Sequence, residues 1–161
     1  MNKYVLVGLA VVAVALGLTL WSNQGARLIL NGSIQKIRLQ AVDDENTVAV
    51  VEFRLNNPAD LPYDVKDVKL LLEPASGAPV EGALFRQKDL DGFFEFHKAT
   101  LGQKYNDTVR IGERWKSHAQ VDKTIAANFP VNAGALSGRK RLLIRLWAGS
   151  GIVPTDIAEQ R

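Results

Sequence analysis

Cysteine is absent from the sequence. Its absence excludes disulfide bonds, thiol catalysis, lipoprotein attachment and zinc sites built on cysteine, whichever compartment holds the protein. Histidine is almost as scarce, since His97 and His118 are its two copies, and imidazole-rich metal sites are therefore excluded too. A Gly-x-Ser-x-Gly nucleophile motif and a glycine-rich phosphate loop are also missing. The sequence thus offers no assembled catalytic set, and we expect neither a cofactor nor a metal site.

An excess of charge of either sign is lacking as well. Twenty Lys and Arg residues face seventeen Asp and Glu residues, so the formal net charge is only +3. Such a balance does not indicate a nucleic-acid partner. About 135 residues remain after the N-terminal apolar run, enough for one domain with a hydrophobic core and too few for two domains of the usual size.

A long apolar run at the N terminus is the most informative segment that is present. The eighteen residues from Tyr4 to Trp21 contain no charged side chain, and Lys3 is the one charge before them. As a helix this run spans about 27 Å, close to the hydrocarbon thickness of a bilayer. Tyr4 and Trp21 lie at its two ends, where amphipathic rings favour the membrane interfaces. The sequence predicts a transmembrane anchor in residues 1–25, with the lipid bilayer as its partner, and one domain in residues 26–161.

A cleaved signal peptide is the main alternative for this run. Cleavage needs small residues at the −3 and −1 positions, and the candidate site after the run ends at Ala26 with Gln24 at −3. That site is poor, so a retained anchor is favoured. A buried helix of the domain is a further alternative, although no downstream helices are predicted to pack against it.

The orientation of the anchor is left open by its flanking charges. Arg27, Lys36 and Arg38 follow the run within the window over which positive charge biases topology. A tail of three residues before an apolar helix is nevertheless typical of simple export anchors. We expect a single-pass membrane protein with its domain on the exported side, periplasmic or extracytoplasmic.

Alternating apolar and polar residues dominate the rest of the chain. In residues 47–56, Ala49, Val51 and Phe53 share one face while Glu52 and Arg54 lie on the other, the pattern of a half-buried strand. Further strands are predicted at 36–42, joined to 47–56 by an acidic turn at 43–46, and at 66–72, 80–85, 115–121 and 142–147.

Two segments give weaker signals. A short helix over Ile125 to Phe129 competes with the continuation of the 115–121 strand, and the middle segment 89–107 has no clean period. With several short strands, turns between them and no long helix after the anchor, the sequence predicts a mainly β fold. We expect a single antiparallel β-sandwich of the fibronectin type III or immunoglobulin-like kind.

The stretch from Val48 to Gly77 resembles the water-stress and hypersensitive-response domain of the type 2 late-embryogenesis-abundant proteins. In that family an apolar strand ends in Asn-Pro, a short loop with a small apolar residue and proline follows, and an alternating strand runs to a glycine turn. Asn57-Pro58 and Leu61-Pro62 stand at these positions. The resemblance implies a fibronectin-like β-sandwich, often tethered by one N-terminal membrane helix. The structural interpretation of Asn57-Pro58 is that asparagine caps the strand end and proline fixes the turn.

Two groups of residues are candidate chemical sites. Asp89, Asp91 and Glu95 resemble a fragment of a calcium loop, but the full signature is absent and a solvated turn is favoured. His118, expected on the polar face of a strand beside Asp122, and His97 have no serine in a nucleophile motif to join them, so exposed surface histidines are favoured.

A basic run near the C terminus gives the one candidate interaction surface. On a strand, Arg141 and Arg145 would share a face with Leu143 and Trp147, which would give a mixed cationic and apolar surface. Arginine and tryptophan are enriched at interaction hot spots. A turn of charged residues that leads into an outer strand face is the alternative.

Two functions from different classes follow. The first is a membrane-anchored, non-catalytic β-sandwich with a binding, protective or accessory-subunit role on a larger membrane protein complex. The second is a small envelope-anchored hydrolase that acts on carbohydrate with two carboxylates brought together from separate strands. Because no pair of carboxylates is singled out, we expect the first.

Overall fold

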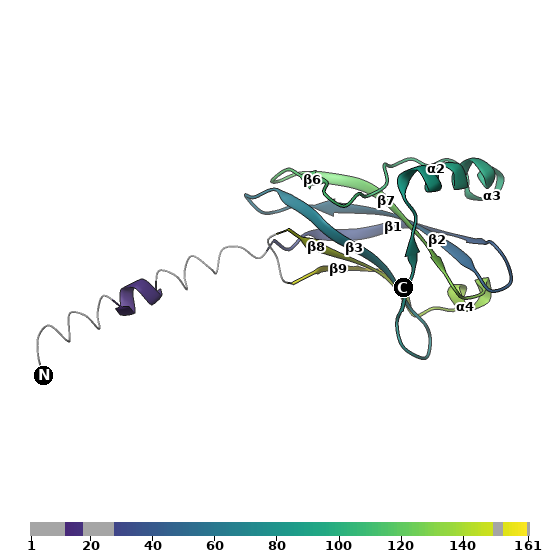
Figure 1. Ribbon diagram of the computed structural model, residues 1–161, viewed down its shortest axis with the longest axis horizontal. Coiled ribbons are helices and arrows are strands. Elements are labelled where there is room, and N and C mark those ends of the chain that lie inside the picture. The colour runs from purple at the N-terminus through teal and green to yellow at the C-terminus, as the bar shows by residue number, and fades with distance from the viewer. Residues whose placement is uncertain (1–11, 18–27, 150–152, 161) are drawn as a thin grey trace, which may run out of the picture.

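The computed structural model describes residues 12–17, 28–149 and 153–160, and they form a mainly β structure of two antiparallel sheets (Figure 1). The first sheet has the strand order β1-β2-β7-β5, and the second has the order β4-β3-β8-β9 with β6 paired to β3. The first sheet contains β1 (Asn31–Ala41), β2 (Thr47–Asn56), β5 (Ala83–Leu84) and β7 (Gln120–Phe129). The second contains β3 (Tyr63–Glu73), β4 (Val80–Glu81), β6 (Arg114–Trp115), β8 (Arg141–Ala148) and β9 (Thr155–Ala158). This arrangement is compatible with the predicted β-sandwich.

The main hydrophobic core is built from the inward faces of the two sheets. Alternate residues of β2, such as Ala49, Val51 and Phe53, pack in one buried cluster with alternate residues of β3 and β8, such as Leu70 and Ile144. Because side chains alternate across a strand, this burial follows the period-two pattern of the sequence. The predicted bounds of the 47–56 strand are confirmed, and the acidic turn before it is confirmed at residues 42–45.

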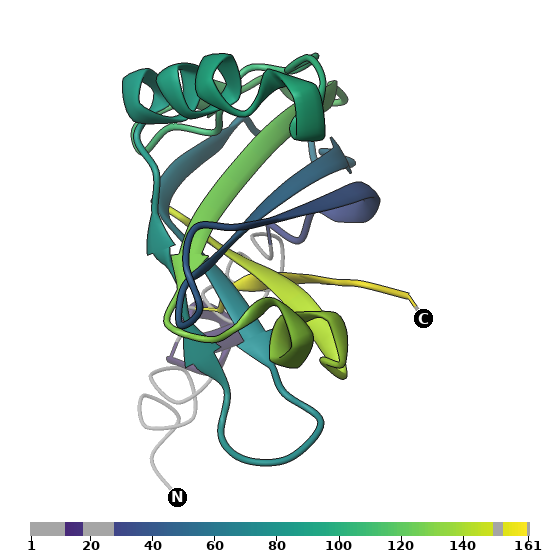
Figure 2. The same ribbon diagram turned by 90° about the vertical axis from the view of Figure 1, so that its right-hand side faces the viewer.

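The outer face of the first sheet is covered by two helices, α2 (Gln87–Phe96) and α3 (Lys98–Leu101), as Figures 1 and 2 show. Leu90, Phe94 and Leu101 from these helices pack against Val48 and Val50 on the outward side of β2. These two helices occupy much of the middle segment 89–107, for which no element was predicted. Leu90 and Phe94 are one helical turn apart, and the apolar surface of β2 gives their side chains a place to be buried.

Three further expectations about single elements were wrong, and one open alternative is decided in favour of a strand. Residues 125–129 are strand rather than helix, because β7 pairs with β2 along its whole length, from Gln120 opposite Asn56 to Phe129 opposite Thr47. The 115–121 strand is interrupted, since β6 ends at Trp115 and β7 begins only at Gln120. The 80–85 strand divides at Gly82 into β4 and β5, which belong to different sheets. The 142–147 strand is not the last, because β9 follows and pairs with β8.

The two ends of the domain differ in the segments they present. At one end, called the near end, β1 begins opposite the end of β2, with Asn31 opposite Asn56, and the Leu30 amide donates to Thr155 Oγ1 at the start of β9. The β2–β3 loop also lies there, and the Asn57 amide in it donates to the Ala119 carbonyl just before β7. At the other, the far end, lie the β1–β2 turn and α4 (Ala133–Ser137). Figure 1 shows the near end at the left and the far end at the right.

The predicted anchor lies largely outside the described residues. Of the run from Tyr4 to Trp21, residues 12–17 are described; they are helical and all of them are exposed. Within the described parts of the chain, no helix has the length and apolar character needed to cross a bilayer.

Candidate interaction surface

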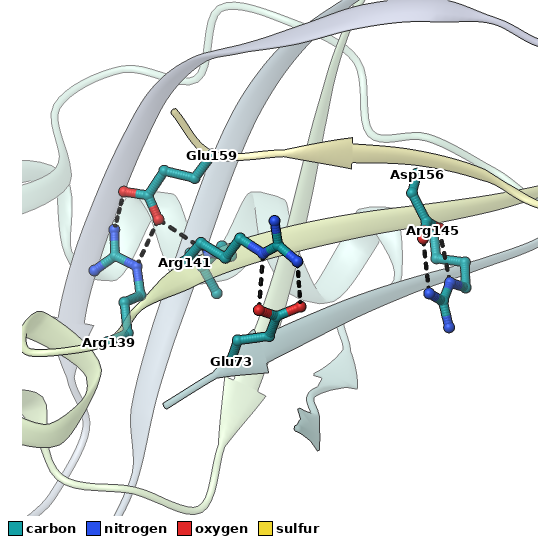
Figure 3. A network of polar contacts seen from close by, with 7 residues as sticks. Glu73, Arg139, Arg141, Arg145, Asp156 and Glu159 are labelled. Atoms are coloured by element: carbon teal, nitrogen blue, oxygen red, sulfur yellow. Dashed lines mark hydrogen bonds and ion pairs between the residues drawn. The ribbon is translucent and has the colours of Figure 1, made fainter. Parts of the chain in front are cut away.

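The outer face of the second sheet carries a ladder of ion pairs between neighbouring strands (Figure 3). At one end of the ladder, Arg141 of β8 lies opposite Glu73 of β3 and binds it through two parallel hydrogen bonds, Nε to Oε2 at 2.8 Å and Nη2 to Oε1 at 2.9 Å. These bonds lower the pKa of the Glu73 carboxyl below its ordinary value and raise the pKa of the Arg141 guanidinium. Both groups are therefore fixed in their charged forms at neutral pH.

A second pair of the same kind lies further along β8. Arg145 donates to Asp156 of β9 through Nε and Nη2, both at 2.7 Å, and this bonding raises the pKa of Arg145. On the other side of Arg145, β3 places Lys69 opposite it, and Lys69 binds Glu81 of β4 at 2.8 Å. Across the four strands, the two cations of the central strands are therefore each paired with a carboxylate of an outer strand.

An apolar strip separates the two charged rows. Leu71 of β3 lies opposite Leu143 of β8, which in turn lies opposite Ala158 of β9. Leu143 is only 6% exposed, while Leu71 and Trp147 are half-buried. We call these residues, together with the ion pairs around them, the ladder face. Within the described residues, no helix packs on the ladder face, which contrasts with the helix-covered first sheet.

The four residues proposed from the sequence do share this face, since β8 turns its other residues, such as Leu142 and Ile144, into the core. The expected cationic excess was wrong, however. Glu73 and Asp156, brought in by β3 and β9, pair with Arg141 and Arg145 and neutralise them. Sequence reasoning missed both partners because β9 was not expected and cross-strand register is not readable from one strand alone.

A third arginine beside the ladder has a structural role. Arg139 is 5% exposed and binds Glu159 through two hydrogen bonds, while one oxygen of Glu159 also accepts from the Leu142 amide (Figure 3). The pair fastens the end of the described chain to the start of β8. It borders a hollow of about 390 Å³ between β1 and the C-terminal segment, which Ile34 and Ile37 also line.

The calcium-loop candidate takes a different form in the structure. Asp89, Asp91 and Glu95 lie on helix α2, not in the solvated turn that was expected. Asp91 is ion-paired with Lys104 and, with Glu95, lines a hollow of about 290 Å³ beside α3. Among the residues that the structure describes, no three histidine, aspartate or glutamate side chains converge on a possible metal position.

The two histidines have different surroundings. His118 is in a turn with a φ of 54°, not on a strand, and its Nε2 is 2.9 Å from Asp60 Oδ1. Asp122, the neighbour expected for it, pairs with Arg54 instead. His97 ends α2 and contacts the rings of Phe93 and Phe96.

The Asn57-Pro58 interpretation is confirmed in its structural part. Asn57 is buried, and its side-chain amide donates to the carbonyls of Leu61 and Lys116 while its oxygen accepts from the Ala59 amide.

The resemblance of the stretch from Val48 to Gly77 to the late-embryogenesis-abundant proteins stays a prediction. Comparison of the chain with protein-family models, with curated proteins and with solved structures finds no match.

Proposed function

We propose that this chain is a non-catalytic binding protein, held at a membrane by its N-terminal run from Tyr4 to Trp21, that serves as an accessory subunit of a membrane complex. The domain is taken as a fibronectin-like or immunoglobulin-like β-sandwich. One observation carries the proposal: α2 and α3 bury the outside of the first sheet, whereas no helix among the described residues packs on the ladder face. The ladder face is the surface that we assign to the partner.

The composition of the ladder face suits a protein partner. Interfaces place aromatic and arginine side chains at their centres, surrounded by a polar rim. Trp147 and Leu71, which are both half-buried, supply apolar contact, and Arg141 and Arg145 are already oriented by their carboxylates. A preorganised arginine loses little side-chain entropy on binding. Because its charges are paired, this face favours a mixed-charge partner over a purely acidic one.

The hydrolase alternative has less support. Glycoside hydrolysis needs two carboxylates that flank the sugar in a cleft. Asp91 and Glu95 both line one hollow, but they come from a single turn of α2, and Asp91 is bound to Lys104. Glu159, beside the larger hollow, is held by Arg139.

The proposal is tested by recovery of the full-length protein from its native membranes in mild detergent, followed by quantitative mass spectrometry. Trp147→Ser should lose a membrane complex that the unchanged protein retains. Tyr105→Ser is the matched control, because Tyr105 is an exposed aromatic residue outside the second sheet. A complex that survives Trp147→Ser and a combined Arg141→Ser and Arg145→Ser change would overturn the assignment of the ladder face. Recovery of the protein with no complex at all would overturn the accessory-subunit role.

A further inference from the structure

We propose that the near end of the domain docks on the bilayer surface itself, so that the domain stands in a fixed orientation on the membrane. This inference rests on the proposed membrane anchor. Its first support is three apolar side chains that remain exposed at the near end although each is next to a well-fixed segment. Ile29 is 52% exposed, Leu61 is 53% exposed and Val153 is 69% exposed.

Backbone and side-chain hydrogen bonds hold these three residues at one end. Ile29 precedes Leu30, whose amide is bound to Thr155, and Val153 lies two residues before Thr155. The carbonyl of Leu61 accepts from Asn57, which also binds Lys116. The three apolar side chains thus come from separate segments that are each held by hydrogen bonds at the same end of the domain, which is the arrangement expected of a surface that inserts into a lipid interface.

The charges of the near end favour an anionic bilayer. Of the carboxylates there, Asp64 is ion-paired with Arg114, and Asp60 Oδ1 lies 2.9 Å from His118 Nε2. Three exposed cations nearby, Lys66, Arg110 and Lys116, form no ion pair with another described residue. Lysine and arginine next to a membrane are attracted by anionic lipid headgroups.

The far end carries an acidic turn. Its β1–β2 turn carries Asp43, Asp44 and Glu45 in sequence. The Asp43 carboxylate accepts from the amides of Glu45 and Asn46, and these bonds lower its pKa, so it stays ionised. The two ends therefore differ in charge, and an anionic surface would attract the cations of the near end and repel the acidic turn of the far end.

The length of the tether makes such docking possible. Seven residue steps separate Trp21, the end of the apolar run, from Leu28. Even a fully extended chain of this length reaches at most about 25 Å. Leu30, two residues further on, is buried in the core. The near end is therefore confined close to the bilayer, and apolar side chains there meet the lipid surface at a high effective concentration.

The test uses single-cysteine variants of the full-length chain, because the sequence has no cysteine of its own. A fluorophore is attached at Leu61→Cys, at Val153→Cys and at Val42→Cys, in vesicles of phosphatidylcholine with phosphatidylglycerol. Val42 is the matched control, because it is also 53% exposed but lies at the far end. We expect iodide in the aqueous phase to quench the two near-end labels several-fold less than the Val42 label. Adding Lys66→Gln and Lys116→Gln should remove most of this protection.

Labels at Leu61 and Val153 that are quenched as strongly as the label at Val42 would overturn the docking inference. A further label at Val12→Cys separates the two proposals. If the Val12 label is protected while the near-end labels are quenched, the anchor stands and the docking fails. If the Val12 label is quenched too, the membrane anchor itself is wrong. Thermal melting of each variant checks that the domain is folded.

Discussion

The guanidinium of Arg38 on β1 forms an ion pair with the carboxylate of Glu52 on β2, and their side chains are only 9% and 10% exposed. Arg38 also donates to the carbonyl oxygens of Leu101 and Gln103 and lies 4.9 Å from the centre of the Phe94 ring. One side chain therefore joins the first sheet to both helices that cover it. In the sequence, the same arginine was considered as a positive charge near the predicted anchor.

Replacing Arg38 with methionine should destabilise the protein by roughly 3–5 kcal/mol, because Glu52 would be left as an unpaired buried charge. The double variant Arg38→Met and Glu52→Leu should recover much of this loss, since no charge then remains buried. Urea unfolding of the full-length chain in non-ionic detergent measures both. An equal loss in the single and double variants would show that the packing of Arg38, and not its charge, holds the helices.

Gly82 and Gly92 should respond in opposite ways to alanine. A Cβ on Gly82 would lie 2.6 Å from Ala127 Cβ and under 3 Å from the Phe129 ring, so Gly82→Ala should cost about 1–3 kcal/mol through overpacking. Gly92 lies inside α2, and a Cβ there would meet no heavy atom within 4 Å, so Gly92→Ala should stabilise by about 0.5–1 kcal/mol. Melting temperatures of the two variants check the signs; a stabilised Gly82→Ala variant would contradict the tight contact between Gly82 and β7.

Asn57→Ala should cost roughly 2 kcal/mol or more. It removes three side-chain hydrogen bonds and leaves the carbonyls of Leu61 and Lys116 without the donor they now share. Asn56→Ala is the control, because the neighbouring Asn56 is exposed. Denaturant unfolding compares the two, and similar midpoints would mean that the loop is held by its prolines alone.

Because Tyr63 is buried, we expect the free energy of unfolding to fall at high pH. The ring is buried against Trp115, and burial raises the pKa of Tyr63 to about 12 although a hydrogen bond with Thr155 acts in the other direction. Between about pH 10 and 12 the unfolded chain releases this proton while the folded chain keeps it, so stability is full below pH 10 and falls as pH rises. The slope approaches roughly 1 kcal/mol per pH unit for a single group.

Tyr63→Phe is the variant that isolates this effect. Between pH 10 and 12, the melting temperature of this variant should fall less than the melting temperature of the unchanged protein. This holds even if the variant has the lower melting temperature at pH 10. Parallel curves for the two proteins over that range would assign the alkaline loss to other groups.

The strands that alternate in sequence were predictable, and the elements between them were not. Residues 47–56 could be delimited because Asn46 and Pro58 flank an alternating run. The same run contains Val48 and Val50 on its polar-side positions, and this was the signal that both faces of β2 are covered. With that signal, the spacing of Leu90 and Phe94 would have favoured a helix over a calcium loop.

For the ladder face, sequence predicted which side chains of β8 share a face but not which charges they meet. Alternation within one strand requires only local geometry. The pairing of Arg145 with Asp156 requires a strand order and a register, and β9 is too short, with Pro154 just before it, to be recognised alone.

The bond between the Leu30 amide and Thr155 also has a mechanical consequence. If a force acts on the domain through the N-terminal run, it is applied at Leu30, which is buried in the hydrophobic core. The pull must first break the latch between Leu30 and Thr155, and only then can it peel β1 from β2, one hydrogen bond after another, beginning with Asn31 opposite Asn56. A Thr155→Val variant should therefore yield at a lower force when pulled from its N terminus, with its resistance to a pull from the C terminus less affected.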